Sequence, residues 1–255
     1  MIKALDILAF GAHPDDVELS AGGTLIMAAR QGKRTGVVDL TRGELGSRGT
    51  AQTRATEAAA AAKILGLAVR ENLGLRDGLP EDEERALMGI VKALRKYQPR
   101  VVLANALEDR HPDHGRAASL VQRAVFLSGL VRIETSIDGQ AQTPHRPRHL
   151  LHYIQDRFRT PDVVVDISGA QQDKFAAIGA YATQFHQAEA TEAGATEAGA
   201  TEDGNKVQTP ISTPEFLEIL RGRDLMMGRS IGVLHGEGFE SAVPIGIENL
   251  DALIR

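Results

Sequence analysis

Short apolar runs alternate with longer segments of helical periodicity along most of this chain. Strands are predicted at residues 5–10, 35–40, 68–73, 101–104, 150–154 and 163–167. Helices are predicted at residues 52–66, 80–97, 114–127, 168–185 and 214–228, and strand and turn at residues 231–247. Strands that alternate with helices favour parallel βαβ units with right-handed crossovers. The pattern therefore predicts an α/β fold with a doubly wound, mostly parallel sheet and helices on both faces.

One segment near residue 200 departs from this alternation. Residues 190–204 repeat the pattern Ala-Thr-Glu-Ala-Gly, the last time in degenerate form. The repeat is too short for a solenoid and lacks large apolar side chains, so we expect a surface loop. A chain of 255 residues can bury one large core. We expect a single domain, 1–255, with a low-complexity loop insertion at about residues 187–208.

The composition excludes several classes of site and partner. The chain has no cysteine, which rules out disulfides, thiolate nucleophiles and thiolate metal sites. Its net charge is −5, no basic tract stands out and tryptophan is absent, so we expect no nucleic-acid partner. No apolar run is long enough for a bilayer, and residues 4–11 lack the features of a signal peptide. These features are typical of a cytoplasmic protein without a membrane partner.

Two histidine–aspartate motifs, about a hundred residues apart, carry the candidate chemistry. His13-Pro14-Asp15-Asp16 follows the first predicted strand, and His111-Pro112-Asp113-His114 follows the fourth. In a doubly wound sheet of order 3-2-1-4-5, strands one and four are neighbours, and a crevice opens at their carboxyl ends. We therefore expect the two motifs to face each other there, in the place where such folds bind ligands.

Imidazole and carboxylate side chains are the ligands that zinc prefers when no thiolate is present. A catalytic zinc ion takes three protein ligands, and we assign His13, Asp16 and His114 to one ion per chain. Ferrous iron is the alternative occupant of such a nitrogen and oxygen site.

The remaining polar residues of the motifs suit proton transfer. Asp15 is predicted to act as the general base on water. His111 is predicted to stabilise an oxyanion or to protonate a leaving amine, as a protonated imidazole oriented by Asp113. The alternative is that Asp15 and Asp16 only cap the following helix, and that the histidines are ordinary surface residues.

An arginine-bearing loop should lie at the same rim of the sheet. Arg54 is the first candidate for binding an anionic substrate, and Arg42 and Arg48 are two more, because guanidinium pairs bidentately with carboxylate. The alternative is that all three are solvated. Gly22-Gly23 lies where a helix is expected, and close backbone packing or a late helix start would explain it.

The two motifs, in their flanks 12–19 and 110–115, resemble the LmbE-like (PIG-L) zinc deacetylases. Further segments, residues 39–46, 73–78, 181–185 and 237–239, resemble the bacillithiol-biosynthesis branch, whose enzyme removes the acetyl group of N-acetylglucosaminyl malate. The resemblance implies a Rossmann-like fold, a cytoplasmic location and a homo-oligomer, often a hexamer. It also implies zinc at His13, Asp16 and His114, Asp15 as base, His111 supported by Asp113, and Arg54 at the substrate.

The sequence departs from the family in two places. Ser20-Ala21 stands where many relatives carry glycine and cysteine, and no tyrosine can be assigned to the oxyanion, although Phe216 occupies a corresponding region. Three other functions are compatible with the pattern: a thiol–sugar S-conjugate amidase, another N-acetylglucosamine deacetylase, and a non-catalytic Rossmann-like sugar- or nucleotide-binding protein. The missing G-x-G-x-x-G after the first strand is evidence against a nucleotide ligand.

Overall fold

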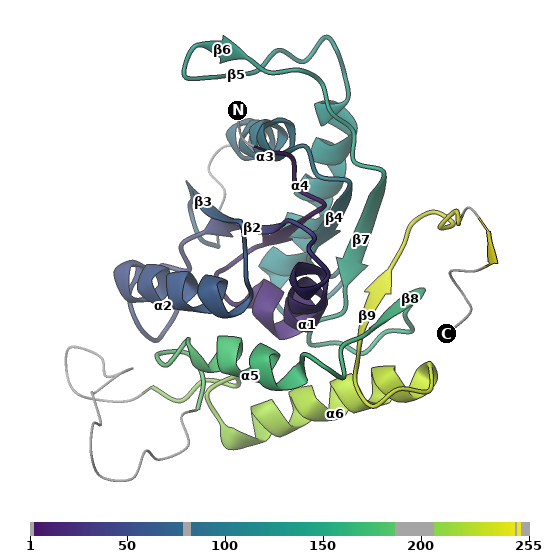
Figure 1. Ribbon diagram of the computed structural model, residues 1–255. Coiled ribbons are helices and arrows are strands. Elements are labelled where there is room, and N and C mark those ends of the chain that lie inside the picture. Colours follow the sequence, from purple (N-terminus) through teal and green to yellow (C-terminus); the bar gives the residue numbers. More distant parts are fainter. Residues whose placement is uncertain (1–2, 79–82, 187–206, 248, 251–255) are drawn as a thin grey trace.

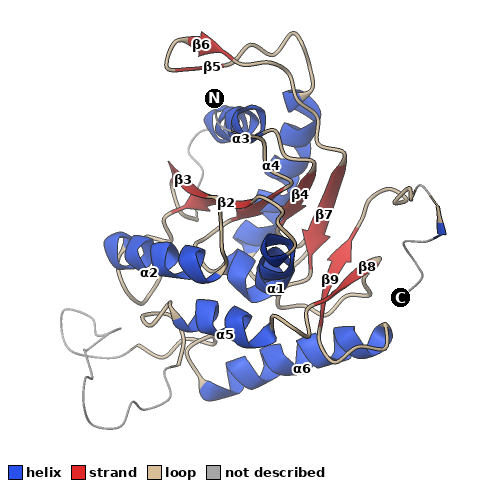
Figure 2. Ribbon diagram, in the orientation of Figure 1, coloured by secondary structure: helices blue, strands red, loops and turns tan. Residues whose placement is uncertain are grey.

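A seven-stranded sheet runs through the centre of the molecule, with helices on both sides (Figures 1 and 2). The computed structural model describes residues 3–78, 83–186, 207–247 and 249–250. The strands of the sheet are β1 (Ile7–Gly11), β2 (Thr35–Thr41), β3 (Val69–Leu75), β4 (Val101–Ala104), β7 (His149–Tyr153), β8 (Val163–Asp166) and β9 (Gly236–Glu240). The helices are α1 (Asp16–Arg30), α2 (Ala51–Ile64), α3 (Glu83–Tyr97), α4 (Pro112–Ser128), α5 (Gln171–Gly179) and α6 (Pro214–Ser230).

The strand order is β3-β2-β1-β4-β7-β9-β8. The first five strands in this order pair in parallel, and β9 pairs antiparallel with both β7 and β8. The predicted order 3-2-1-4-5 is therefore confirmed, with β7 as the fifth strand. The central strands are nearly continuous apolar runs because helices cover both faces of the sheet.

The helices form layers on the two faces of the sheet. Helices α3 and α4 pack on one face, with a core of leucine, valine and alanine side chains between them and the strands. Helices α1 and α2 cover the other face, and α5 and α6 lie outside them as a further layer (Figure 1). The doubly wound architecture opens its crevice where β1 and β4 end.

Two elements differ from the prediction. A hairpin of β5 (Ser136–Ile137) and β6 (Gln140–Ala141) was not expected, although Asp138-Gly139, with φ of 50° and 77°, is a typical hairpin turn. Helix α5 is shorter than the predicted helix 168–185, because the chain passes into turns that bury Tyr181 and Phe185. The predicted helix start at residue 80 and most of the predicted loop insertion lie outside the described residues.

Gly22-Gly23 lies inside α1, so a late helix start does not explain the pair, and close packing explains Gly23. A Cβ atom on Gly23 would lie 2.8 Å from Cβ of Ile167, and the amide of Gly23 donates to Glu237. We expect Gly23→Ala to lower the free energy of unfolding by about 1–3 kcal/mol, because this contact leaves no room for a methyl group. Urea denaturation measures the change.

Gly179→Ala is the matched control, since its Cβ would meet no atom within 4 Å. This variant is expected to keep the stability of the parent or to gain up to about 1 kcal/mol from helix propensity. Equal stability of the Gly23→Ala variant and the parent would contradict the packing argument.

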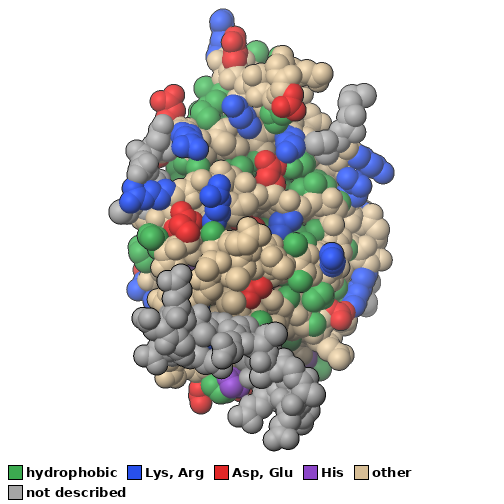
Figure 3. Space-filling model, turned by 90° about the vertical axis from the view of Figure 1, so that its left-hand side faces the viewer, with side chains coloured by type: hydrophobic (Ala, Val, Ile, Leu, Met, Phe, Trp, Pro, Cys, Tyr) green, Lys and Arg blue, Asp and Glu red, His purple; other side chains and the backbone are tan. Residues whose placement is uncertain are grey.

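The described surface is mixed in charge. On the face shown in Figure 3, Lys and Arg side chains are interspersed with Asp and Glu side chains. Among the helices of the described residues, none combines the length and the apolar character that crossing a membrane requires.

Candidate active site

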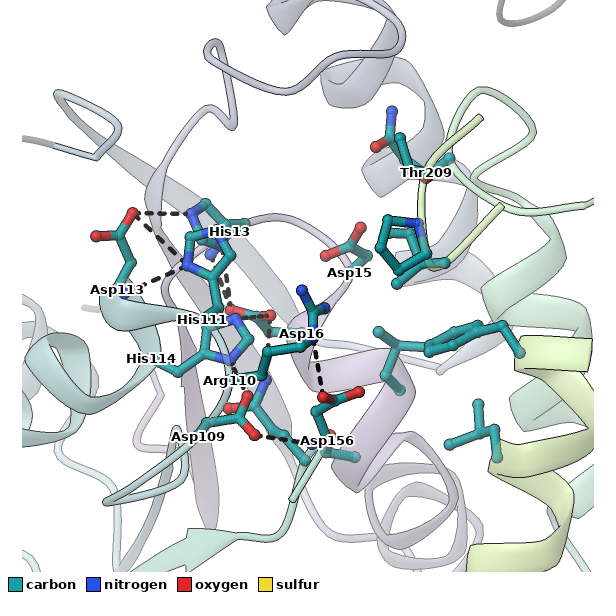
Figure 4. Close-up of a pocket in the computed structure, with 18 of the residues that line it drawn as sticks. His13, Asp15, Asp16, Asp109, Arg110, His111, Asp113, His114, Asp156 and Thr209 are labelled. Atoms are coloured by element: carbon teal, nitrogen blue, oxygen red, sulfur yellow. Dashed lines mark hydrogen bonds and ion pairs between the residues drawn. The ribbon is translucent and has the colours of Figure 1, made fainter. Parts of the chain in front are cut away.

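The two histidine–aspartate motifs meet at the carboxyl ends of β1 and β4 (Figure 4). Ring centroids are 4.9 Å apart for His13 and His111, and 5.0 Å apart for His111 and His114. The three imidazoles offer nitrogen atoms that all lie within 4.8 Å of one another. The adjacency of β1 and β4 thus brings together groups from opposite ends of a hundred-residue segment.

Asp16, the first residue of α1, is held by a buried amide network. One carboxylate oxygen accepts from the amide of His13 and from Nδ2 of Asn105, each at 3.0 Å. The other accepts from Nε2 of Gln155 at 3.2 Å and lies 3.1 Å from Nε2 of His114. These contacts fix the carboxylate beside the imidazoles.

Carboxylates also orient the two buried histidines. Asp109 contacts Nδ1 of His114, so that Nε2 of this ring is the atom that faces Asp16. Nε2 of His13 lies 3.0 Å from Asp77 and 3.4 Å from Asp113. Histidine ligands of metals are commonly held by carboxylates in this way.

The charges of the cluster favour a cation. Burial alone would lower the pKa of His13, but contacts with Asp113 and Asp77 outweigh it and raise the pKa to about 10. Burial would also lower the pKa of His114, but the carboxylates of Asp16 and Asp109 outweigh this effect and raise the pKa to about 9. The carboxylates thus draw protons onto both imidazoles, and a divalent cation would satisfy the same demand.

The donor set fits zinc or ferrous iron, since it consists of imidazole nitrogens and carboxylate oxygens without sulfur. Two groups have donor atoms within 4.8 Å of one another, namely His13, His111 and His114, and His13, Asp77 and Asp113. Asp16 adjoins the first group through His114. The geometry therefore places the predicted ligands together and adds His111, Asp77 and Asp113 as further donors around the same position.

Asp15 occupies the N-cap position of α1 without capping the helix. Its side chain accepts no hydrogen bond from the helix, and its φ of 113° lies in the left-handed region. Such a conformation in a non-glycine residue costs about 1–3 kcal/mol and is found preferentially at functional sites. The alternative that Asp15 is only a helix cap is therefore wrong, because the carboxylate is turned toward Arg54 and the cavity.

Arg54 lies against Asp15 at the floor of the cavity. Its guanidinium donates to the Asp15 carboxylate at 2.8 Å and also to the carbonyls of Pro14 and Gly43. Burial raises the pKa of Asp15 to about 7, although Arg54 and His13 act in the opposite direction. Gly43 makes room for the guanidinium, since a Cβ there would collide with it.

His111 differs from the other two histidines. It is the N-cap of α4, where its Nδ1 accepts from the amide of Asp113, and its side chain is 40% exposed. Burial and the neighbouring His13 and His114 lower the pKa of His111. This shift of the pKa opposes the predicted protonated form, and the hydrogen bond that Nδ1 accepts from the amide of Asp113 acts in the same direction. A ring that accepts at Nδ1 still carries a donor at Nε2.

Asp113 was expected to orient His111. Its carboxylate is 4.0 Å from Nδ1 of His111 but 3.4 Å from Nε2 of His13. Asp113 therefore lies between the two rings and contacts His13 more closely.

Two of the three predicted arginines lie elsewhere. Arg48 donates to the carbonyls of Thr183 and Val207, and Arg42 is exposed and lines a separate cavity of about 420 Å³. Among the described residues that line the cavity of the histidines, the arginines are Arg54, Arg110 and Arg223. Both arginines therefore lie outside this cavity, although Leu45, Gly46 and Ser47 of the same loop line it.

Sequence reasoning missed several residues of the site. Asn105 immediately follows β4, and Gln155 and Asp77 lie two residues after the ends of β7 and β3. These positions at strand ends are the signal by which the sequence could have indicated them. Arg223, from α6, donates to the carbonyls of Leu19 and Gln155. No local pattern marked Arg223, because its contacts are distant in the sequence.

A cavity of about 660 Å³ contains this cluster. Figure 4 shows His13, His111, His114 and Asp113 on one side and Thr209 on the opposite side. Helix α6 forms part of that opposite wall, where Phe216 stacks on Phe185 with the rings 5.9 Å apart. The cavity is thus polar at the histidines and largely apolar across from them.

Comparisons with known proteins identify a matching family model and a similar solved structure. The family model described as GlcNAc-PI de-N-acetylase (PIG-L) matches residues 8–125. The crystal structure of the conserved protein TT1542 from Thermus thermophilus superposes with a TM-score of 0.79 at 36% identity, over 95% of this chain and 97% of that one.

Two relatives carry named activities. The chain is 28% identical to a 4-oxalmesaconate hydratase of Pseudomonas putida, over 95% of the chain and 91% of that protein. It is 27% identical to a 1D-myo-inositol 2-acetamido-2-deoxy-alpha-D-glucopyranoside deacetylase of Nakamurella multipartita, over 87% of the chain and 91% of that protein.

Proposed function

The chain belongs to the PIG-L family of N-deacetylases, and from this membership we propose that it hydrolyses the acetamide of an N-acetylated glucosamine conjugate, with zinc as its metal. The observation that carries the proposal is the joint position of the imidazole and carboxylate cluster and the uncapped Asp15 in one cavity. A structural metal site would need no strained carboxylate beside it.

The roles of the side chains follow from their contacts. His13, Asp16 and His114 would hold the metal, and a bound zinc ion supplies Lewis acidity that activates water and polarises a carbonyl. Asp15 takes the proton of the attacking water, because its Oδ1 has no hydrogen bond among the described residues while Oδ2 is held by Arg54. The proton then passes to the departing amine.

His111 is suited to bind the acetyl oxygen. Its Nδ1 is occupied by the amide of Asp113, so the Nε2–H is left to donate toward the cavity. Asp109 and Asp77 are positioning residues that keep His114 and His13 in place.

We propose N-acetylglucosaminyl malate, the substrate of bacillithiol biosynthesis, as the specific conjugate. Its support is the resemblance of the motifs and the presence of Arg54 and Arg110 in the cavity, since guanidinium groups suit malate carboxylates. Arg110 pairs with the half-exposed Asp156 and can exchange this partner for a substrate carboxylate at little cost.

The similarity to a hydratase over nearly the whole chain favours a second candidate function. Addition of water to a carbon–carbon double bond of an anionic acid needs the same elements: an activated water, a base and cationic side chains. The two functions differ in the product that they release.

Acetate release from N-acetylglucosaminyl malate tests the first function. We expect turnover by the zinc-loaded protein, its loss after chelation and its return after zinc is restored, with metal content measured on the same samples. Loss of ultraviolet absorbance of 4-oxalmesaconate, without acetate release from any glucosamine conjugate, would overturn the deacetylase proposal and support the hydratase.

A further inference from the structure

The wall of the cavity opposite the histidines is made of large apolar side chains. These are Ile211, Phe216, Ile219, Leu220 and Met226, four of them from α6, and Phe158 lines the same cavity. Malate leaves this wall without a partner, because its carboxylates match the arginines and not an apolar surface. The wall is therefore unexplained by the substrate proposed above.

Several of these side chains are unusually exposed. Ile219 is 70% exposed, Phe158 is 58% exposed and Met226 is 57% exposed. Large apolar groups that gather on an exposed surface commonly mark a binding site. Here they share one cavity with the histidine cluster, so a molecule whose acetamide reaches the cluster also reaches the wall.

The wall is held in place before any ligand binds. Arg223 ties α6 to the carbonyls of Leu19 and Gln155, and both oxygens of Asp224 accept from the buried Lys174 of α5 at 2.8 and 2.9 Å. A preformed apolar surface binds an apolar group without an ordering cost. This anchoring of α6 therefore favours a role of the wall in binding over an incidental exposure of its apolar side chains.

We propose that this wall binds an apolar alkyl or aryl substituent of the substrate, attached to the amino sugar on the side away from the acetyl group. The inference rests on the proposed deacetylase function and extends its substrate class beyond N-acetylglucosaminyl malate, to N-acetylglucosamine conjugates with a hydrophobic aglycone. Burial of methylene groups against the wall raises kcat/KM, because the substrate loses apolar contact with water when it binds.

Methyl, hexyl and phenyl β-N-acetylglucosaminides test the proposal by their rates of acetate release. We expect kcat/KM for the hexyl and phenyl glycosides to exceed that for the methyl glycoside by at least about tenfold, since each buried methylene contributes several-fold. Equal values for the three glycosides would overturn the inference and leave the deacetylase function intact.

Variants of residues on α6 test whether the gain in kcat/KM depends on the apolar wall. Ile219→Asp and Met226→Asp are expected to bring kcat/KM for the hexyl glycoside close to that for the methyl glycoside. Leu225→Asp is the matched control, because Leu225 is an exposed residue (44%) of the same helix that is not among the described residues lining the cavity. This control should keep the full gain.

Two further measurements separate the remaining outcomes. If no glycoside releases acetate, the proposed function fails, and calorimetric binding of hexyl β-glucoside to the parent and to Ile219→Asp then tests the wall alone. Light scattering of the variants tests whether a second copy of this chain covers the wall. A fall in molecular mass together with an equal loss on all three glycosides would assign the wall to a subunit interface and overturn the inference.

Discussion

Asp15→Asn is expected to lower kcat for acetate release by about 10²–10⁴-fold, the usual contribution of a general base. The amide keeps the shape of the carboxylate and can still contact Arg54, but it cannot take a proton from water. Asp15 is turned into the cavity at φ 113°, where its side chain contacts Arg54 and does not cap the helix, and asparagine also tolerates a positive φ. We therefore expect the loss to appear in kcat with little change in stability.

Metal content and unfolding midpoint are the controls for this variant. Both should match the parent, because Asp15 is not among the proposed ligands. Asp173→Asn, which removes an exposed carboxylate paired with Arg30 on the outer layer, should keep the parent rate. A rate near that of the parent in Asp15→Asn with full metal content would rule out the base role.

His114→Ala is expected to reduce zinc affinity by more than about 100-fold, which exceeds the usual effect of removing a residue that only orients a ligand. His114 lies 3.1 Å from Asp16 and is oriented by Asp109, so its loss also leaves two buried carboxylates without their cationic neighbour. Acetate release should fall in parallel with bound zinc, measured by elemental analysis after gel filtration.

His149→Ala provides the comparison, because His149 opens β7 at the strand end away from the site. Its zinc content and rate should equal those of the parent. Stoichiometric zinc and full activity in His114→Ala would remove His114 from the ligand set, and would direct attention to the other donor group, His13, Asp77 and Asp113.

Much of the fold could be predicted because the strands are local apolar runs separated by helical periodicity. The position of both motifs followed from the same pattern, since each lies directly after a strand. The hairpin turn at Asp138-Gly139 was missed, although its signal is local. The shortened α5 could not be predicted, because it depends on the burial of Tyr181 and on the bond of its hydroxyl to Glu18.

The site likewise contains contacts that the sequence could not predict. The pairing of Asp77 with His13 joins residues 64 positions apart, and the network of Asn105 and Gln155 around Asp16 spans 139 positions. Neither has a local pattern, because contacts of this kind arise only when strand ends converge. Arg54 was the first candidate among the three arginines, and it is the one that reaches Asp15, from the first turn of α2.

The amino-acid sequence by itself determined the α/β architecture, the adjacency of β1 and β4 and the chemical types gathered there, because these depend on periodicity and on short motifs at strand ends. Only the tertiary structure decided the conformation of Asp15, the contacts of the His111 ring, the carboxylates around His13 and the apolar wall of α6. These features depend on which distant segments pack together, and the free energy of that packing is shared among contacts that no local stretch of sequence contains.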